Sequence, residues 1–536
     1  MSGEAIEAYR GRSLADRVTT WIAVLAATAM LAWIQLSFDG LYDLDSYFHV
    51  RAAEQLAANG VQKQLPQAVF STWADAYSDK DFLFHGFLIP FASGEDLVAG
   101  GKWGVIALDL LVLAAVAFAI ETLGIRFGAL WILLLVAASP YYVTRLLPLR
   151  PHLVGLALIA VEISLLVRDR WKTLFGVAFV HVLAHSSFPL LLALLVARAA
   201  TSLVRGAAVP WRSAGAVIAG VLVATLVHPY FPNNLSVAYS QIVELAAQLW
   251  TGAGGIPREA FGSELGPMKL DSFVKQAPAW IPAVAGVIAV LAVQGRHGWS
   301  TRDLFLALVA AGFLGLALAS RRFLDVAVLS AVLLAGALWT RLAAGRMTSD
   351  LFRASPLRAG AAAALLVACV IAGQARVWAE VPADLARQSF GGVFRGDVAR
   401  LDEIAEPGDV VYHPSWRDFS YLYFFRPDGR YIVGLDPVFL WGKDPRLFRK
   451  SFALSRGMSQ NPRQVLARDF DARWIFVTRE ARSQAFRNLL AKTPGFEIVH
   501  DGYAAEIWRV PTGPVPAPAR RPGRPAKRAK PAGPAS

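Results

Sequence analysis

Apolar runs of near-membrane length recur through the first 376 residues, and they constrain the fold more than any other feature. An α-helix needs about 20 apolar residues to cross the hydrocarbon core of a bilayer. The sequence therefore predicts a polytopic α-helical membrane protein of about 11 spans. The runs lie at 18–37, 102–120, 128–143, 152–167, 173–185, 188–203, 213–228, 278–294, 303–319, 323–340 and 359–376. A further run at 82–92 is too short to cross and is expected to lie in the interface or to re-enter it.

Composition agrees with this class and excludes others. Of the 536 residues, 55% are hydrophobic and 17% are charged, and the mean hydropathy is +0.43, which excludes a disordered chain. The net charge is +13, but the basic residues outside the C-terminal tail are spread over short loops, which argues against a nucleic-acid partner. A single cysteine, Cys369, leaves no disulfide framework or zinc cluster within one chain. We expect the first apolar run to be a retained span, not a cleaved signal peptide.

Basic residues fall in alternate loops, and this pattern predicts the orientation in the membrane. Loops rich in lysine and arginine face the cytoplasm, so the N-terminus is expected inside and the C-terminal part outside. The residues that carry this argument are Arg10, Arg12, Arg17, Arg126, Arg168, Arg170, Lys172, Arg198, Arg205, Arg212, Arg296, Arg302, Arg341, Arg346, Arg353 and Arg358. The loops predicted on the outer side are 38–101, the region around 144–151, the long loop 229–277 and the turn 320–322.

The hydropathy pattern changes after residue 376, which separates a transmembrane domain (1–376) from the rest of the chain. Between 377 and 510, short β-rich runs such as GDVVYH and RWIFVT alternate with helical stretches, which predicts a small extracytoplasmic α/β domain. The last segment, 511–536, is basic and rich in proline and alanine, and we expect it to be disordered.

The first outer loop opens with DGLYDLDSYFHVR, in which Asp45, His49 and Arg51 lie close together just past the first apolar run. Charged groups at the edge of the hydrocarbon are costly unless they have a task. A carboxylate beside a histidine can hold a divalent cation, and an arginine near that cation can hold a phosphate. This stretch predicts a site for a lipid-phosphate sugar on the outer face. The alternative is that these residues only anchor a helix end at the interface.

Two further outer loops carry candidate site residues. Arg145, Arg150 and His152 lie in SPYYVTRLLPLRPHLVG, where they are expected either to contact a phosphate or a second metal, or to extend to the interface as ordinary anchors. Glu264 lies in the long outer loop, within PREAFGSELGP. A flexible loop of this kind can close over a substrate, although most glutamates in such loops are simply solvated.

Arg321 and Arg322 open a span on the predicted outer side, against the preference of basic residues for the cytoplasm. Two arginines there need an anion, and a lipid phosphate or pyrophosphate suits their bidentate hydrogen bonding. An ion pair with Asp325 is the alternative. In the soluble domain, Trp416 and Asp418 within PSWRDFSYLYF predict either contact with a hydroxyl-bearing acceptor or a place in the domain core.

These motifs, in this order, resemble the catalytic subunit of oligosaccharyltransferase, a member of the C-type membrane glycosyltransferase (GT-C) superfamily. Asp45–Arg51 is similar to the family's D-P-W-F-N-Y-R-like motif, Trp73–Asp75 to its W-F-D, and Pro140–Arg145 to its P-G-Y-x-S-R. Later in the chain, Ala184–Phe188 is similar to S-W-G-G-Y, and Ser415–Tyr421 to S-W-W-D-Y-G-Y. The resemblance runs from the first span to about residue 440.

The resemblance implies a transferase that moves a glycan or sugar from a polyprenyl-linked phosphate or pyrophosphate to an acceptor at the outer face of the cell membrane. Asp45, with or without a Mg²⁺ or Mn²⁺ ion, would orient or deprotonate the acceptor. Arg321 or Arg322, with Arg51 or Arg145, would neutralise the leaving lipid phosphate.

The chain departs from the family in two places. The family's second acidic motif, D-N-E, is replaced by Arg150-Pro151-His152, which removes two metal-ligand carboxylates. Either no metal is required, or it is held by Asp45 with His152, His49 and loop glutamates. The acceptor motif has Arg417 in place of its second tryptophan and Ser420 in place of its glycine, which points to an acceptor other than the usual sequon.

Two other functions remain open from the sequence. One is a polyprenyl-monophosphate-sugar transferase that modifies a lipid or a polysaccharide. The other belongs to a different class, a non-catalytic transporter of lipid-linked glycans or an assembly scaffold. A transporter is expected to line a path across the whole membrane and to contain a repeated half, and the sequence has neither feature.

Overall fold

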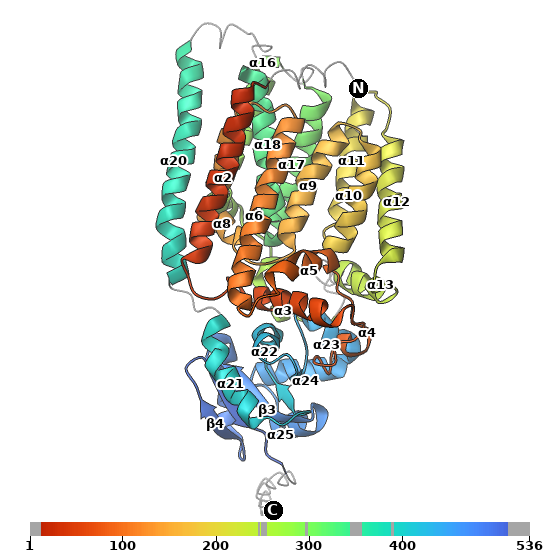
Figure 1. Cartoon of the computed structure of the whole chain (residues 1–536), viewed down its shortest axis with the longest axis vertical. Helices are drawn as coiled ribbons and strands as arrows, with labels where there is room; N and C mark the ends of the chain where they lie inside the picture. Colours follow the sequence, from red (N-terminus) through yellow and green to blue (C-terminus); the bar gives the residue numbers. More distant parts are fainter. Residues whose placement is uncertain are drawn as a thin grey trace, which may run out of the picture.

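The computed structural model describes residues 12–244, 247, 255–294, 299–343, 356–386 and 391–512. Figure 1 shows two parts: a body of roughly parallel helices and, at one end of it, a smaller α/β domain. The predicted fold class is confirmed by this arrangement. Residues 513–536, which hold nearly all of the predicted basic tail, lie outside the described residues.

Every predicted apolar run is helical, but the helices differ in length. Five helices are long and apolar enough to span a bilayer on their own. They are α2 (Leu14–Leu36), α6 (Leu97–Thr122), α17 (Thr301–Ala319), α18 (Leu324–Ala343, with the preceding turn) and α20 (Pro356–Ala386). Two bent pairs bring the number to seven if each pair is one span. The pairs are α7 (Gly128–Val136) with α8 (Pro140–Leu146), and α15 (Leu270–Gln276) with α16 (Trp280–Gln294).

The other four predicted spans are shorter apolar helices that run beside the long ones in Figure 1. They are α9 (His152–Val167), α10 (Trp171–Ala184), α11 (Pro189–Val204) and α12 (Trp211–Val227). Proline explains the two bends, because Pro140 begins α8 after a serine cap and Pro278 stands between α15 and α16. The prediction of about 11 spans thus holds for the helices, while the number that cross completely stays a prediction.

Burial separates the centre of the helical body from its periphery. In α18, 89% of the apolar window is buried, and in α6 61%, whereas in α20 it is 22%. Large apolar side chains such as Ile218, Leu222 and Leu226 on α12 are exposed. An outer surface of this kind is expected where helices face lipid.

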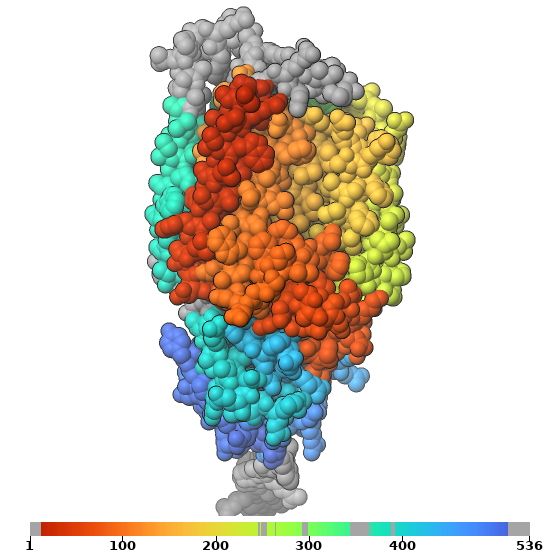
Figure 2. Space-filling model, in the orientation of Figure 1, coloured from red at the N-terminus to blue at the C-terminus, as the bar shows by residue number. Residues whose placement is uncertain are grey.

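Three short helices fill the junction between the two parts, as Figure 1 shows. They are α3 (Leu44–Asn59), α4 (Trp73–Ala76) and α5 (Phe82–Leu88), and all belong to the first outer loop. The structure thus confirms that the run at 82–92 is too short to be a span. On the face seen in Figure 2, residues of this loop separate the helical body from the α/β domain.

The α/β domain contains a five-stranded sheet of order β2-β1-β3-β5-β4. Its strands are β1 (Val410–Tyr412), β2 (Arg430–Tyr431), β3 (Ala472–Thr478), β4 (Glu497–Asp501) and β5 (Ala505–Arg509). β1 pairs in parallel with β2 and β3, while β5 is antiparallel to both β3 and β4. The β-rich runs predicted from sequence are therefore confirmed, although residues 377–386 extend helix α20 and do not belong to the sheet domain.

The first outer loop is attached to this domain by main-chain hydrogen bonds. The Tyr431 N–H donates to the Gln67 carbonyl at 2.7 Å, and the Val69 N–H donates to the Tyr431 carbonyl at 2.9 Å. These bonds lengthen the β2 edge of the sheet with residues from the membrane domain. Helix α22 (Phe419–Phe425) packs on α3, with the Tyr47 and Phe424 rings 5.0 Å apart and edge to face. The two parts consequently share a continuous interface.

Candidate functional site

Charged side chains from four distant segments meet at the junction of the two parts. We call this group the junction cluster; its members are Asp43, Asp45, Arg145, Arg150, Glu264 and Asp325. The segments come from the first outer loop, the second outer loop, the long outer loop and the start of α18. Their predicted convergence on one side of the helical body is confirmed by the ion pairs that join them.

Arg150 lies at the centre of the junction cluster. Its Nε donates to Asp43 Oδ2 at 2.5 Å, its Nη2 lies 2.8 Å from Asp45 Oδ2, and its Nη1 lies 3.4 Å from Glu264 Oε2. The four side chains are between 18 and 34% exposed, so water reaches the group but does not dominate it. One guanidinium therefore holds three carboxylates, and the group retains an excess of negative charge.

Local backbone structure explains how these groups are held. Asp43 precedes α3 with a φ of 75°, a left-handed conformation that is uncommon for a residue other than glycine. The second outer loop is fixed to α3 because the Leu149 N–H donates to Ser46 Oγ at 2.9 Å. Prolines at 148 and 151 flank Arg150 and restrict the backbone on both sides of it. Arg150 is thus held by a short, stiff loop.

Glu264 reaches the cluster on a loop that is attached at two points. The Ser320 hydroxyl donates to the Glu264 carbonyl at 3.3 Å, and the indole Nε1 of Trp416 donates to the Ala260 carbonyl at 2.9 Å. Burial raises the pKa of Glu264, but Arg150, Arg322 and Arg145 outweigh that effect and lower it to about 2. Glu264 is consequently a carboxylate at any physiological pH.

Asp45 has the opposite balance. Burial raises the pKa of Asp45 above its ordinary value, Arg150 opposes this shift, and the neighbouring carboxylates of Asp43 and Glu264 add to it. A carboxylate with a raised pKa accepts a proton more readily than one in water. This is the electrostatic setting that a general base requires.

Arg145 and Asp325 form a second ion pair within the cluster. Arg145 Nη2 lies 2.9 Å from Asp325 Oδ2, and Arg145 Nη1 lies 3.5 Å from Glu264 Oε2. His152 Nε2 bonds to the Arg145 carbonyl at 2.9 Å. The alternative in which Asp325 neutralises Arg321 or Arg322 is therefore wrong, because Arg145 occupies that carboxylate.

Arg321 and Arg322 lie at the rim of the cluster, in the short turn η6 (Arg321–Phe323), and both are exposed. The Arg321 N–H donates to the Gly266 carbonyl at 3.1 Å, so the turn is fixed to the loop that carries Glu264. Within the described part of the chain, neither guanidinium forms an ion pair with a carboxylate. These two cations are therefore available for an anionic ligand beside the acidic group.

The predicted metal ligands do not gather around one point. His49 Nδ1 is 2.9 Å from His85 Nε2, whose own Nδ1 is 2.7 Å from Asp79 Oδ2, so His49 belongs to a separate buried chain. His152 faces the Arg145 carbonyl, and Asp45 faces Arg150. Among the described residues, no three His, Cys, Asp or Glu side chains are arranged to hold a metal ion. With Arg150 between the carboxylates, the residues present do not fit a divalent cation.

Three other predicted binding residues have structural contacts instead. Arg51 donates from Nη2 to the Phe424 carbonyl at 2.6 Å, which links α3 to the α/β domain. Trp416 holds the long outer loop through its indole N–H. Asp418 is completely buried and lies 3.6 Å from Arg482. For Asp418 the structure corrects the expectation of acceptor contact in favour of the core alternative, because solvent does not reach its carboxylate.

Two acidic residues at or near the site are not among the predicted site residues. Asp43 lies in the first acidic stretch, two residues before Asp45, and this spacing is the sequence signal for it. Asp436 caps α23 (Pro437–Lys443), and the charges of Asp45, Lys80 and Arg322 affect its pKa. Burial raises the pKa of Asp436 to about 6. No sequence signal places Asp436 near the membrane domain.

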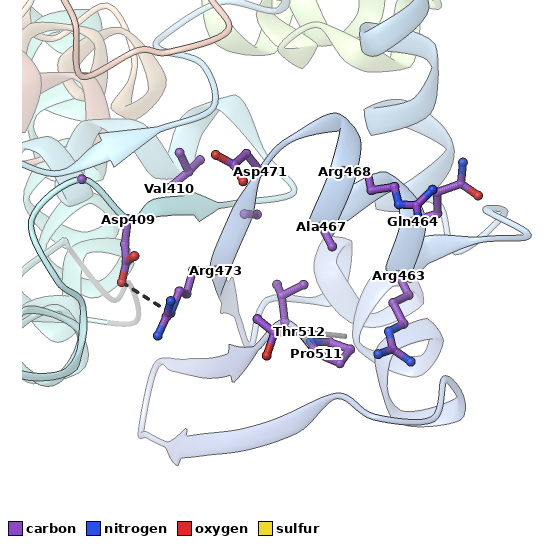
Figure 3. A pocket seen from close by; sticks show the side chains of 13 residues that line it. Asp409, Val410, Arg463, Gln464, Ala467, Arg468, Asp471, Arg473, Pro511 and Thr512 are labelled. Carbon is purple, nitrogen blue, oxygen red and sulfur yellow. Dashed lines mark ion pairs between the residues drawn. The ribbon is translucent and has the colours of Figure 1, made fainter. Parts of the chain in front are cut away.

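The α/β domain also contains a cavity of about 370 Å³ that is separate from the junction cluster. Figure 3 shows Arg463, Arg468 and Arg473 around it, with Asp409 paired to Arg473. Only residues of the α/β domain line this cavity, so it takes no part in the meeting of the outer loops.

No model of a known protein family matches the sequence, and no curated protein matches it. Solved structures do match the fold. ArnT from Cupriavidus metallidurans, solved with bound undecaprenyl phosphate, superposes with a TM-score of 0.55 at 14% identity and covers 91% of this chain and 98% of its own. The Archaeoglobus fulgidus oligosaccharyltransferase gives 0.57 at 12% identity over 85% of this chain and 69% of its own.

The mycobacterial arabinofuranosyltransferase AftD gives a TM-score of 0.51 at 15% identity, over 91% of this chain and 41% of its own. Two of the three neighbours are named as sugar transferases, an oligosaccharyltransferase and an arabinofuranosyltransferase. This chain shares their fold, which is the GT-C fold that the motif resemblance predicts.

Proposed function

We propose that the protein is a membrane glycosyltransferase that moves a sugar or glycan from a polyprenyl-linked phosphate to an acceptor. The observation that carries this proposal is the position of a partly exposed carboxylate with a raised pKa, Asp45, in one cluster with two exposed arginines at its rim. The likeness in fold to a protein solved with undecaprenyl phosphate supports the choice of donor class.

The reaction requires charge movement at two atoms. The acceptor oxygen attacks the anomeric carbon and loses its proton to Asp45, while the bond between that carbon and the lipid phosphate oxygen breaks. The phosphate leaves with one more negative charge. Arg321 and Arg322 would neutralise that charge, because preorganised cations stabilise charge that develops in the transition state. Arg145 is less suited to this role, since Asp325 and Glu264 already hold it.

Within this proposal, a lipid or a polysaccharide is a better supported acceptor than a protein. The family motif for a protein acceptor falls on Ser415–Tyr421, where Asp418 is buried and Trp416 bonds to the long outer loop. The Asp418 carboxylate is not available to an acceptor peptide in this conformation, and the indole N–H of Trp416 already has a partner. Transfer to a protein sequon remains the second candidate, supported by the motif order and by the likeness to the archaeal oligosaccharyltransferase.

The test is transfer by purified protein in liposomes from a synthetic undecaprenyl-phosphate sugar to lipid, polysaccharide or peptide acceptors. We expect Asp45→Asn to lower transfer by about 100-fold or more, the usual contribution of a general base. Asp39→Asn is the matched control, because Asp39 is exposed in the same loop. Full activity of folded Asp45→Asn would remove Asp45 from the mechanism, and no transfer to any acceptor by the unaltered protein would favour a transporter or scaffold.

We also propose that the α/β domain is extracytoplasmic and the membrane is the cell membrane, since the positive-inside pattern requires it. Tyr503 is 85% exposed in this domain, and Cys369 is the single cysteine. In a Cys369→Ala background, Tyr503→Cys should react with an impermeant maleimide on intact spheroplasts. Labelling only after lysis would place the domain, and the junction cluster with it, on the cytoplasmic side.

A further inference from the structure

We infer that the guanidinium of Arg150 performs at the junction cluster the role of a divalent cation, so that transfer by this protein requires no metal ion. This inference rests on the proposed function for its consequence in catalysis. Its structural part, the replacement of a cation by an arginine, stands on the contacts of Arg150 alone and has a separate test in metal binding.

The contacts of Arg150 use every face of its guanidinium. Nε, Nη1 and Nη2 each point to a different carboxylate, on Asp43, Glu264 and Asp45 respectively. The contact with Asp43 is a short charge-assisted hydrogen bond of 2.5 Å, and the contact with Asp45 is an ion pair of 2.8 Å. An arginine that merely extended to the interface would not gather three acids from two separate outer loops. The arrangement is a coordination shell in which the planar cation is the centre.

A divalent metal and this guanidinium exclude each other. Magnesium binds oxygen ligands at about 2.0–2.1 Å from a single point, whereas a guanidinium distributes its ligands around a planar edge several ångströms wide. A metal ion beside Arg150 would also face Arg145 and the exposed Arg322, which already act on Glu264. As long as Arg150 stays in place, its guanidinium occupies the space between the three carboxylates, which leaves no position there for a second cation.

The chain keeps Arg150 in this position by its backbone, and this separates it from a mobile surface residue. The Arg150 N–H donates to the Pro148 carbonyl at 2.9 Å, and Leu149 is bonded to Ser46 on the same helix that carries Asp45. Glu264 is fixed to the rim turn by the Ser320 hydroxyl. The three acids therefore meet Arg150 as parts of a rigid frame, which is what a preorganised site needs.

In the reaction, Arg150 acts as a positioning residue. It holds Asp45 in the orientation that accepts the acceptor proton and keeps Glu264 beside it. A single positive charge neutralises less of the leaving phosphate than a metal does. The exposed Arg321 and Arg322 at the rim complement it, because they add charge where the phosphate departs.

The experiment measures Mn²⁺ binding by electron paramagnetic resonance, a readout that does not depend on transfer. We expect the unaltered protein and Asp45→Asn to bind the same amount of Mn²⁺, because the unaltered junction cluster holds none. Folded Arg150→Ala should bind one additional Mn²⁺ per chain, because the variant leaves three carboxylates without their cation. The triple variant Arg150→Ala/Asp43→Asn/Glu264→Gln is the control and should lose that ion. Mn²⁺ should also raise the unfolding temperature of Arg150→Ala and leave that of the control unchanged.

Transfer is measured in parallel. In the unaltered protein it should change less than about twofold with EDTA, while in Arg150→Ala it should fall at least about tenfold and recover in part with Mn²⁺. A Mn²⁺ ion in the unaltered protein that Asp45→Asn removes would overturn the inference, as would loss of its transfer in EDTA. Folded Arg150→Ala that gains no Mn²⁺ would overturn it too. Arg150→Lys keeps the positive charge and should therefore bind no additional Mn²⁺. It is the second variant for this measurement if Arg150→Ala does not fold.

The failures are distinguishable. Absence of transfer from every polyprenyl-phosphate sugar, together with the expected Mn²⁺ results, would reject the proposed function and leave the replacement of a cation by Arg150 intact. Normal transfer without metal, combined with no gain of Mn²⁺ in Arg150→Ala, would support the proposed function and reject the replacement of a cation by Arg150.

Discussion

The two ends of the helical body each carry a cluster of aspartate and arginine, and the clusters are built in opposite ways. At the junction, one arginine lies among three carboxylates that are partly exposed. At the other end, where α17 begins and α18 ends, Asp303 is fully buried between Arg302 and Arg341, with contacts of 2.8 and 2.6 Å. The cluster around Asp303 keeps its carboxylate away from solvent. The junction cluster is partly exposed and contains more carboxylates than arginines.

Exposure and completeness of hydrogen bonding are the features by which we distinguish a structural ion pair from a candidate functional one in this chain. Arg302 also donates to the Leu123 carbonyl at 2.6 Å, so the closed cluster joins α17 to the end of α6. It completes its own hydrogen bonding and offers nothing to a ligand. The junction cluster, in contrast, is partly exposed and has the exposed Arg321 and Arg322 at its rim, so an anionic ligand can still bind there. Variants in each cluster and in the α/β domain test whether the two clusters differ in role in this way.

The largest effect is expected for the closed cluster. Asp303→Asn leaves two arginines facing each other without their acid, which should destabilise the protein by about 3–5 kcal/mol. Thermal unfolding in detergent measures this change, and transfer per folded molecule should stay normal. The double variant Asp303→Asn/Arg341→Met removes one of the unpaired charges and should regain part of the stability. Loss of transfer without loss of stability would contradict the structural role.

At the rim of the open cluster we expect the reverse. Arg321→Ala/Arg322→Ala removes the cations proposed to receive the leaving phosphate, so transfer should fall by about 100-fold. The unfolding temperature should change little, because both side chains are exposed. Arg400→Ala, on the exposed face of α21 (Arg395–Ile404), is the control. A loss confined to KM would indicate that the arginines bind the donor and do not stabilise the transition state.

Asp418 tests the same contrast within the α/β domain. Burial raises its pKa to about 6, with Arg482 opposing. The folded pKa is above the ordinary value of 3.8, so the charged carboxylate costs stability at neutral pH. That cost should disappear as pH falls through 6 towards 4. Asp418→Asn should therefore be more stable than the unaltered protein at pH 7.5, by up to about 2–3 kcal/mol, and should lose the advantage near pH 4.

The smallest effect is expected at the anchor of the long outer loop. Trp416→Phe keeps the ring but removes the indole N–H that donates to the Ala260 carbonyl. Loss of one such bond should cost about 1 kcal/mol. Hydrogen exchange should increase in residues 258–265, while Trp474→Phe on β3, which removes the indole bond to Asp409, should leave that segment unchanged. Unaltered exchange would mean that the loop is held by its contacts with the 320–321 turn alone.

Hydropathy predicts the long and the shorter apolar helices of the body except α15, since a bilayer leaves few alternatives for long apolar runs. The alternation of basic loops likewise predicts which distant loops meet, because it depends only on the parity of the spans between them. Whether helices cross completely is less predictable. Pro140 divides the run 128–143, and Pro278 lies between α15 and the helix of the run 278–294; the bends of about a right angle at these two places depend on tertiary packing.

The partners within the site escaped prediction for a related reason. Asp325 pairs with Arg145 and not with its sequence neighbours Arg321 and Arg322, and His49 turns to His85. Arg150 finds its three acids only because two prolines and the bond to Ser46 fix its loop. Charge type and approximate location follow from the sequence, whereas the choice of partner depends on distances of a few ångströms that no pattern encodes.

The edge of the sheet that accepts residues 67–70 has a consequence for how a carrier lipid gains access. To swing the α/β domain away, the protein would have to break main-chain hydrogen bonds between Tyr431 and the first outer loop. The domain is thus a fixed wall and not a hinged cover. In the proposed reaction, a prenyl chain would therefore enter from between helices in the plane of the bilayer, and the acceptor would approach beside the domain from the aqueous side.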